Sequence, residues 1–338
     1  MLLAASLTAL TACGGSSDGG ADNAANKAAN KAAQGNTKVA TGGEDFSQAA
    51  AETAKLGSDA APGEFPRTVK QSMGETKIDA KPQRVVVLDT GELDEVLSLG
   101  ITPVGMATSE GANPIPSYLA DKVKGVETIG NVQEINVEKV AELKPDLILG
   151  SQLRSDKIYS QLSEIAPTVF SIRPGFPWKE NFALAADALG EETKAAEVMK
   201  KYDADIADLK SSVKGEPKVS LLRFLPSKIR IYGDLSLIGT ILNDAGLQRP
   251  DNQHINELAK EISAENISEA DGDYIFYSSY GTPDTTQESK VVAGAGWKAL
   301  KGVEAGHAIR VNDDVWFLGL GPIGAEQIVS DLKAELAK

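Results

Sequence analysis

The 338-residue chain has very little cysteine and histidine, with one cysteine and two histidines. A single cysteine excludes an internal disulfide and a cysteine-based zinc site, and two histidines leave little for a histidine-rich metal centre. Basic residues are also scarce, because 34 lysines and arginines stand against 48 aspartates and glutamates, for a net charge of −14. We therefore expect no nucleic-acid partner, since affinity for a phosphate backbone rests on excess lysine and arginine.

The chain opens on an apolar stretch, MLLAASLTAL, that is far shorter than the roughly 20 residues of a membrane-spanning helix. Such a stretch is typical of the hydrophobic region of a signal peptide. The residues that follow, Leu10-Thr11-Ala12-Cys13-Gly14, resemble a bacterial lipobox, in which the cysteine takes a lipid and becomes the mature N-terminus. We therefore expect residues 1–13 to be a lipoprotein signal peptide and Cys13 to be the lipid anchor, on the extracytoplasmic face of the cell membrane.

Residues 14–64 are dominated by small and polar residues, and Phe46 is their only aromatic residue. This composition offers too little apolar surface to offset the entropy of ordering the chain. The sequence predicts a flexible tether over this range.

From residue 65 onward, short β-branched runs alternate with segments whose apolar residues recur every three or four positions. This alternation is typical of mainly parallel sheets covered by helices on both faces. It occurs in two series, which predict an α/β lobe over 65–190 and a second over 214–338. The expected strands are 84–89, 101–107, 126–130, 146–151 and 167–172 in the first lobe, and VSLLRFL, IRIYG, DYIFYSS, HAIRV and VWFL in the second.

The segment between the two series, residues 191–213, contains neither glycine nor proline. Its apolar residues lie three to four positions apart, which predicts a single amphipathic helix. At 1.5 Å per residue this helix would be about 35 Å long, enough to connect two lobes.

Two segments of the chain resemble each other without gaps. Residues 135–149 read INVEKVAELKPDLIL, and residues 262–276 read ISAENISEADGDYIF. Each predicts a short helix with a glutamate in its first turn, Glu138 or Glu265, followed by a buried strand. This internal repeat indicates two related lobes that present equivalent glutamates.

Several segments together resemble the solute-binding lipoproteins of iron-siderophore ABC importers. They are KPQRVVVLD, LGITPVG, VEKVAELKPDLIL, the long connecting helix, the Ile-Tyr-Gly-Asp segment before LIGTILNDAG, and the stretch WKALKGVEAGHAIRVNDDVWFLGLGPIGAEQIV. The resemblance implies two Rossmann-like lobes joined by one rigid helix, with a ferric siderophore, haem or cobalamin held between them. It also implies that Glu138 and Glu265 dock on arginines of the membrane permease, and we expect a monomer with no cofactor or metal ligand of its own.

Ligands of open α/β sheets sit beyond the carboxyl ends of the strands. A ferric siderophore wraps iron in its own oxygens and often carries negative charge, so the protein needs guanidinium groups and aromatic faces. In the relatives that the chain resembles, an arginine just before a tyrosine contacts the siderophore, which points to Arg230 and Tyr232. The predicted ligand-binding residues are Arg223, Arg230, Tyr232, Arg154, Trp316, Tyr280 and Thr90, among strand-end positions that also include Glu92, Thr108, Ser109 and Gln152.

Other functions fit the sequence less well. Residues 319–324 match GxGxxG, but the dinucleotide fingerprint needs a following strand and an acidic residue about 20 positions on, and only 14 residues remain. No GxSxG motif supports an enzyme. Haem is the closest alternative ligand, with His254 or Tyr280 as its axial residue. A surface interaction lipoprotein without a transport role is the alternative from a different class, since a fold alone does not prove transport.

Overall fold

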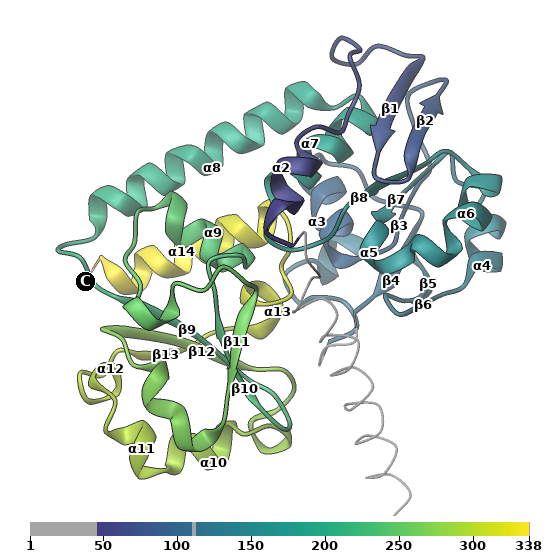
Figure 1. Cartoon of the computed structure of the whole chain (residues 1–338). Coiled ribbons are helices and arrows are strands. Elements are labelled where there is room, and N and C mark those ends of the chain that lie inside the picture. Colours follow the sequence, from purple (N-terminus) through teal and green to yellow (C-terminus); the bar gives the residue numbers. More distant parts are fainter. Residues whose placement is uncertain (1–45, 110–112, 338) are drawn as a thin grey trace, which may run out of the picture.

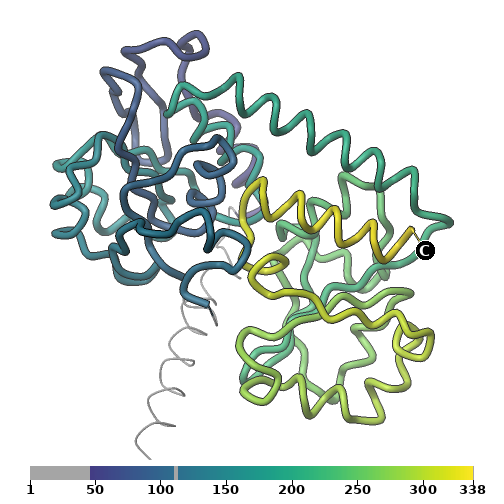
Figure 2. The backbone as a smooth tube through the Cα atoms, turned by 180° about the vertical axis from the view of Figure 1, so that it is seen from behind, coloured from purple at the N-terminus to yellow at the C-terminus, as the bar shows by residue number. Residues whose placement is uncertain are grey.

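The computed structural model describes residues 46–109 and 113–337. Two lobes, each built on one sheet, are linked by the long helix α8, Glu192–Ser212 (Figure 1). The helix lies within the predicted range, and at 1.5 Å per residue its 21 residues extend over about 31 Å. The C-terminal helix α14, Pro322–Leu336, packs along α8, and seen from behind the two run side by side (Figure 2).

The first sheet has six strands in the order β6-β5-β4-β3-β7-β8, all parallel to their neighbours except β6. Its central strands are runs of valine, leucine and isoleucine that are buried on both faces. The strands are β3 Val85–Val87, β4 Gly105–Thr108, β5 Glu127–Asn131, β6 Glu134–Ile135, β7 Leu147–Ser151 and β8 Thr168–Ser171.

Helices cover both faces of this sheet. A separate hairpin that was not predicted from the sequence, β1 Arg67–Gln71 with β2 Gly74–Ile78, packs beside β8. The helix α3 packs against α7 on one face, and α4 packs against α6. The helices are α3 Thr90–Ser98, η2 Ala120–Val123, α4 Val137–Glu142, α5 Gln152–Ser155, η3 Asp156–Ile158, α6 Tyr159–Ile165 and α7 Trp178–Leu189.

The second sheet has five strands in the order β11-β10-β9-β12-β13 and is mixed, because β10 runs antiparallel to both of its neighbours. Leu221 and Phe276 face α8, α9 and α14, whereas Leu222 and Ile275 face the opposite cluster around Trp297. The strands are β9 Val219–Phe224, β10 Ile229–Tyr232, β11 Ala259–Ile262, β12 Tyr274–Ser279 and β13 Ala308–Arg310.

The expected strand at VWFL is wrong, because this segment forms the helical turn α13, Asp313–Trp316. The side chain of Asn312 accepts a hydrogen bond from the backbone of Asp314 and so caps the turn, and two aspartates occupy its first positions. The other helices of this lobe are α9 Leu237–Asp244, η4 Asp251–Gln253, η5 Ala264–Ala270, η6 Pro283–Thr285, α10 Glu288–Ala293, α11 Ala295–Lys298 and α12 Lys301–Glu304.

The prediction of a tether up to residue 64 is wrong for its last part. Residues 46–53 form the short helices η1, Phe46–Gln48, and α2, Ala49–Thr53, which lie where the two lobes meet (Figure 1). Phe46 is only 6% exposed. The prediction rested on the average composition of the whole range, which does not show that its one aromatic residue packs in a buried cluster.

The internal repeat corresponds to equivalent units of the two lobes. In each, a short antiparallel edge strand, β6 or β11, leads through a helix into a central parallel strand, β7 or β12. Asp146 accepts hydrogen bonds from the backbone nitrogens of Gln83 and Arg84, and its counterpart Asp273 accepts one from Lys218. Each aspartate thus fixes the chain just before the neighbouring parallel strand. The helix of the second unit, η5, is a 3₁₀-helix.

Candidate functional site

Each sheet has one switch point, a place between two neighbouring parallel strands from which the chain continues toward opposite edges of the sheet. In the first, the chain passes from β3 to β4 on one side and from β7 to β8 on the other. In the second, it passes from β9 to β10 and from β12 to β13. Ligands of open α/β sheets bind outside the carboxyl ends of strands at such points. The residues there therefore define the candidate site.

In the second lobe this point is occupied by Arg223 of β9. Its Nε donates a hydrogen bond of 2.7 Å to Asp313 Oδ1, and its Nη1 donates one of 3.3 Å to the hydroxyl of Tyr232. The rings of Tyr280 and Phe317 cover the guanidinium at 4.6 and 5.3 Å from its carbon. Burial alone lowers the pKa of Arg223, but the Asp313 carboxylate and Tyr232 hydroxyl raise it well above its usual value. Arg223 is thus a permanent cation under two aromatic rings.

Arg230 lies directly opposite Arg223 in the β9–β10 register, and Glu261 lies opposite Arg230 on β11. The Nε and Nη2 atoms of Arg230 donate hydrogen bonds of 3.1 and 3.0 Å to Glu261 Oε1. Arg230 is fully buried, and its Nη1 has no hydrogen-bond partner among the described residues. The two predicted arginines therefore form one row across the sheet, inside the lobe instead of on its surface.

The first lobe has a matching ion pair at its own switch point. Arg154, which follows β7, donates through Nε to Asp89 Oδ2 at 3.0 Å, and Asp89 caps the start of α3 after β3. The next residue, Thr90, donates its hydroxyl to the carbonyl of Leu318 in the second lobe at 3.3 Å. Because Leu318 follows Phe317, which covers Arg223, the two switch points lie close together.

Further contacts hold the lobes together beside this junction. The carboxylate of Asp314 accepts hydrogen bonds from the side-chain amide of Asn113 and the backbone of Ser117. The carboxylate of Asp94 on α3 accepts from the backbone nitrogens of Ile323 and Gly324, and so caps the first turn of α14 across the lobes. The contacts that α3 and α14 make are thus part of the junction.

Four carboxyl groups are buried at the start of α3: Asp89, Glu92, Asp94 and Glu95. Burial raises the pKa of Glu92 to about 8, with a further contribution from the charge of Asp89. Burial also raises the pKa of Asp94 to about 6 and that of Glu95 well above its usual value. Glu92 and Glu95 line a cavity of about 10 Å³, room for a single water molecule. Glu92 and Glu95 therefore favour the protonated state in the folded protein near neutral pH.

We expect Glu92→Gln to stabilise the protein at pH 8 and to leave its stability at pH 4 unchanged. The folded state holds the Glu92 proton up to about pH 8, whereas an unfolded glutamate releases it near pH 4.5. The folded state therefore binds more protons in this range, so wild-type stability must fall as pH rises from about 4.5 to 8, by a few kcal/mol at about 1.4 kcal/mol per pKa unit. Thermal unfolding from pH 4 to 9 measures this slope.

The matched control for this prediction is Glu127→Gln, since Glu127 is an exposed glutamate of the same lobe. It should unfold with the same pH profile as the wild type. A Glu92→Gln variant whose profile also overlays the wild type would contradict the assigned role of Glu92.

The structure corrects one predicted ligand residue and adds two carboxylates to the site. Trp316 belongs to the core, because it is 1% exposed, stacks on Phe276 at 4.8 Å and donates its indole nitrogen to Asp331. Asp89 and Asp313, the carboxylates that pair with Arg154 and Arg223, were not among the predicted site residues. Their signal was an aspartate at the end of a buried strand, VVVLD, and a paired aspartate after the asparagine of the NDD segment.

The two predicted docking glutamates occupy equivalent exposed positions. Glu138 lies in the first turn of α4, where Asn136 caps the helix, and Glu265 lies in the first turn of η5. Both side chains are exposed, and no ion pair within the described residues involves either one. Both are therefore accessible to another protein.

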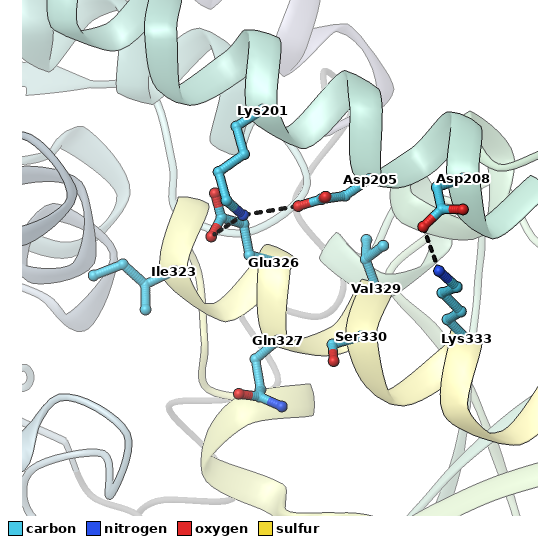
Figure 3. Close-up of a pocket in the computed structure, with 9 residues that line it drawn as sticks. All are labelled: Lys201, Asp205, Asp208, Ile323, Glu326, Gln327, Val329, Ser330 and Lys333. Carbon is cyan, nitrogen blue, oxygen red and sulfur yellow. Dashed lines mark hydrogen bonds and ion pairs between the residues drawn. The ribbon is translucent and has the colours of Figure 1, made fainter.

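A groove of about 460 Å³ lies away from the switch points, between α8 and α14. Its charged side chains pair with each other: Lys201 with Asp205 and Glu326, and Lys333 with Asp208 (Figure 3). The charged side chains of its lining are thus already paired, and we assign no ligand to it.

Two other features concern the described residues alone. They contain no helix that is both long and apolar enough to cross a membrane. Within the same part of the chain, no three histidine, cysteine, aspartate or glutamate residues converge as metal ligands. The predicted anchor Cys13 and the signal peptide lie outside the described residues.

Known proteins resemble this chain in both sequence and fold. Residues 85–315 match the model of the family described as "Periplasmic binding protein". The "Probable siderophore-binding lipoprotein YfiY" of Bacillus subtilis is 38% identical over 80% of this chain and 88% of its own length. The "Petrobactin-binding protein YclQ" of the same organism is 30% identical over 80% and 88%. The crystal structure of Staphylococcus aureus SirA complexed with staphyloferrin B superposes with a TM-score of 0.72 at 31% identity, covering 80% of this chain and 98% of SirA. The chain therefore belongs to the periplasmic binding protein family.

Proposed function

We propose that this protein captures a ferric siderophore between its lobes and delivers it to an ABC permease for iron uptake. The observation that carries the proposal is the pair of arginine–aspartate contacts, Arg154 with Asp89 and Arg223 with Asp313, at the two adjoining switch points. Relatives whose names specify siderophores support it. The protein would act from the extracytoplasmic face of the membrane, anchored through Cys13, with residues 65–190 and 214–338 as the two lobes.

The proposed chemistry is recognition without catalysis. The siderophore supplies the oxygens that hold iron, so the protein contributes only hydrogen-bond donors, positive charge and aromatic faces. Arg154 and Tyr280 are partly exposed, and Arg223 lies beneath the Tyr280 ring. We propose that a ligand meets Arg154 and Tyr280 first and approaches the positive charge of Arg223 when the ring moves aside. Thr90, Arg230 and Tyr232 are buried next to these residues and would support their positions without reaching the ligand first.

Binding assays with a panel of ligands test the proposed function. We expect the full-length chain to bind at least one ferric catecholate, carboxylate or hydroxamate complex, and to leave haem and cobalamin unbound. Intrinsic fluorescence suits the measurement, because Trp178 of the first lobe donates its indole nitrogen to Thr240 of the second at 3.2 Å and so reports on their packing. A Soret band that shifts on mixing with haem would favour the haem alternative, and no binding to any ligand would contradict transport.

A further inference from the structure

Phe46, in the segment that precedes the first lobe, lies beside the candidate site. The ring of Phe46 lies over the guanidinium of Arg173, with 3.9 Å from the guanidinium carbon to the ring centre. The ring of Phe176 lies 5.1 Å from that of Phe46 and 5.5 Å from the same guanidinium carbon. Arg173 follows β8 at the carboxyl end of the first sheet, and the charge of Arg154 acts on it. Phe46 therefore covers a cation at the same edge of the first sheet as Arg154 of the candidate site.

This segment touches both lobes. Phe46 and Ala49 pack with Ile172 and Phe176 of the first lobe and with Leu235 and Leu258 of the second. A change in the relative position of the lobes must therefore disturb these contacts. We call residues 46–53, which form η1 and α2, the strap.

The chain on the C-terminal side of the strap is anchored to the first lobe. After the strap, Ser58 donates to Asp187 at 2.6 Å, and the buried Arg67 pairs with Asp187 and Glu192 at the junction of α7 and α8. The strap itself has a 3₁₀-helix of three residues and a helix of five, lengths that are unstable without tertiary contacts. Its contacts with α7 and the small cluster around Phe46 must hold it in place, so it belongs to the elements that open most readily.

We propose that the strap is a displaceable cover of the ligand site, in which Phe46 competes with an anionic ferric complex for Arg173. Burial and the nearby charge of Arg154 lower the pKa of Arg173 to about 9, so an anion beside this guanidinium would be favoured. The strap also lies outside residues 85–315, the part that matches the family. The inference rests on the proposed function and adds to it a preference for ligands of negative charge.

The test compares binding of ferric complexes of different charge to full-length Phe46→Ala and wild-type protein. If the strap covers the site most of the time, its removal raises the apparent affinity by the inverse of the uncovered fraction, about three- to tenfold. We expect this gain for anionic complexes such as ferric citrate and none for the cationic ferrioxamine B. The gain should disappear in an Arg173→Gln background, because Phe46 then has no cation to cover.

Phe65→Ala is the matched control. Phe65 is also an aromatic residue that lies over an arginine, Arg67 at 4.5 Å, but at the α7–α8 junction instead of the ligand site. It should not tighten ligand binding. Hydrogen–deuterium exchange on the wild type gives a second measurement, in which residues 46–53 should exchange faster when an anionic complex is bound.

Three results would overturn the inference while leaving the proposed function in place: unchanged or weaker binding by Phe46→Ala, an equal gain in the Arg173→Gln background, or protection of residues 46–53 by the ligand. A wild-type chain that binds no ferric complex at all would overturn the proposed function and this inference together.

Discussion

A chain that carries both Glu138→Ala and Glu265→Ala should bind its ferric ligand with unchanged affinity and should fail to support iron uptake. Both glutamates are exposed, each stands in the first turn of a short helix, and the internal repeat makes them equivalent in the two lobes. Their loss costs the fold little, because a charge near a helix N-terminus contributes under about 1 kcal/mol. We propose that a permease with one basic patch for each lobe loses both contacts at once.

The measurement is uptake of radioactive iron by cells whose only copy of the gene carries the double change, next to a binding titration of the purified variant. Glu127→Ala with Glu304→Ala is the matched control, since it also removes one exposed glutamate from each lobe. The control should transport normally. Normal uptake by the Glu138 and Glu265 variant would refute the docking assignment, and weaker ligand binding would place these residues in the ligand site instead.

The features that the sequence predicted well depend on short stretches of chain. The runs RVVVLD and DLILGS predicted β3 and β7, because a short continuous run of β-branched and apolar residues is typical of a strand that is buried on both faces of a sheet. The helix α8 followed from apolar spacing over an unbroken range without glycine or proline. The equivalence of Glu138 and Glu265 followed from the repeat, since the same pattern of apolar residues and acids folded into the same unit twice.

What the sequence could not predict depends on residues that meet only in the folded chain. Arg223 and Asp313 are 90 positions apart, and Phe46 and Arg173 are separated by most of the first lobe. The strand-end rule selected Arg223 and Arg230 as ligand-binding residues, but it could not show that Asp313 and Glu261 pair with them inside the lobe. Phe46 was assigned to the tether because the local composition does not show that Phe176 and Arg173, which are distant in sequence, bury its ring.

Replacing Arg223 by methionine should weaken the fold and abolish ligand binding. The change leaves the Asp313 carboxylate, whose side chain is 15% exposed, without its cation, and breaking a buried pair costs about 3 to 5 kcal/mol. It also removes the cation that we propose attracts the siderophore, and loss of a buried arginine contact of about 2 to 4 kcal/mol lowers affinity by roughly 30- to 1,000-fold. Chemical denaturation and a binding titration measure the two losses.

The double variant Arg223→Met with Asp313→Leu separates the two roles. Replacing both charges by apolar side chains removes the uncompensated carboxylate, so stability should return to near the wild-type value. Affinity should stay lost, because no other residue of the described chain offers a guanidinium under Tyr280 and Phe317. If the double variant recovers stability and affinity together, Arg223 serves the fold alone and the ligand is held by Arg154 and its neighbours. If it recovers neither, Ser278, which also donates to Asp313, depends on that carboxylate to hold β12 in place.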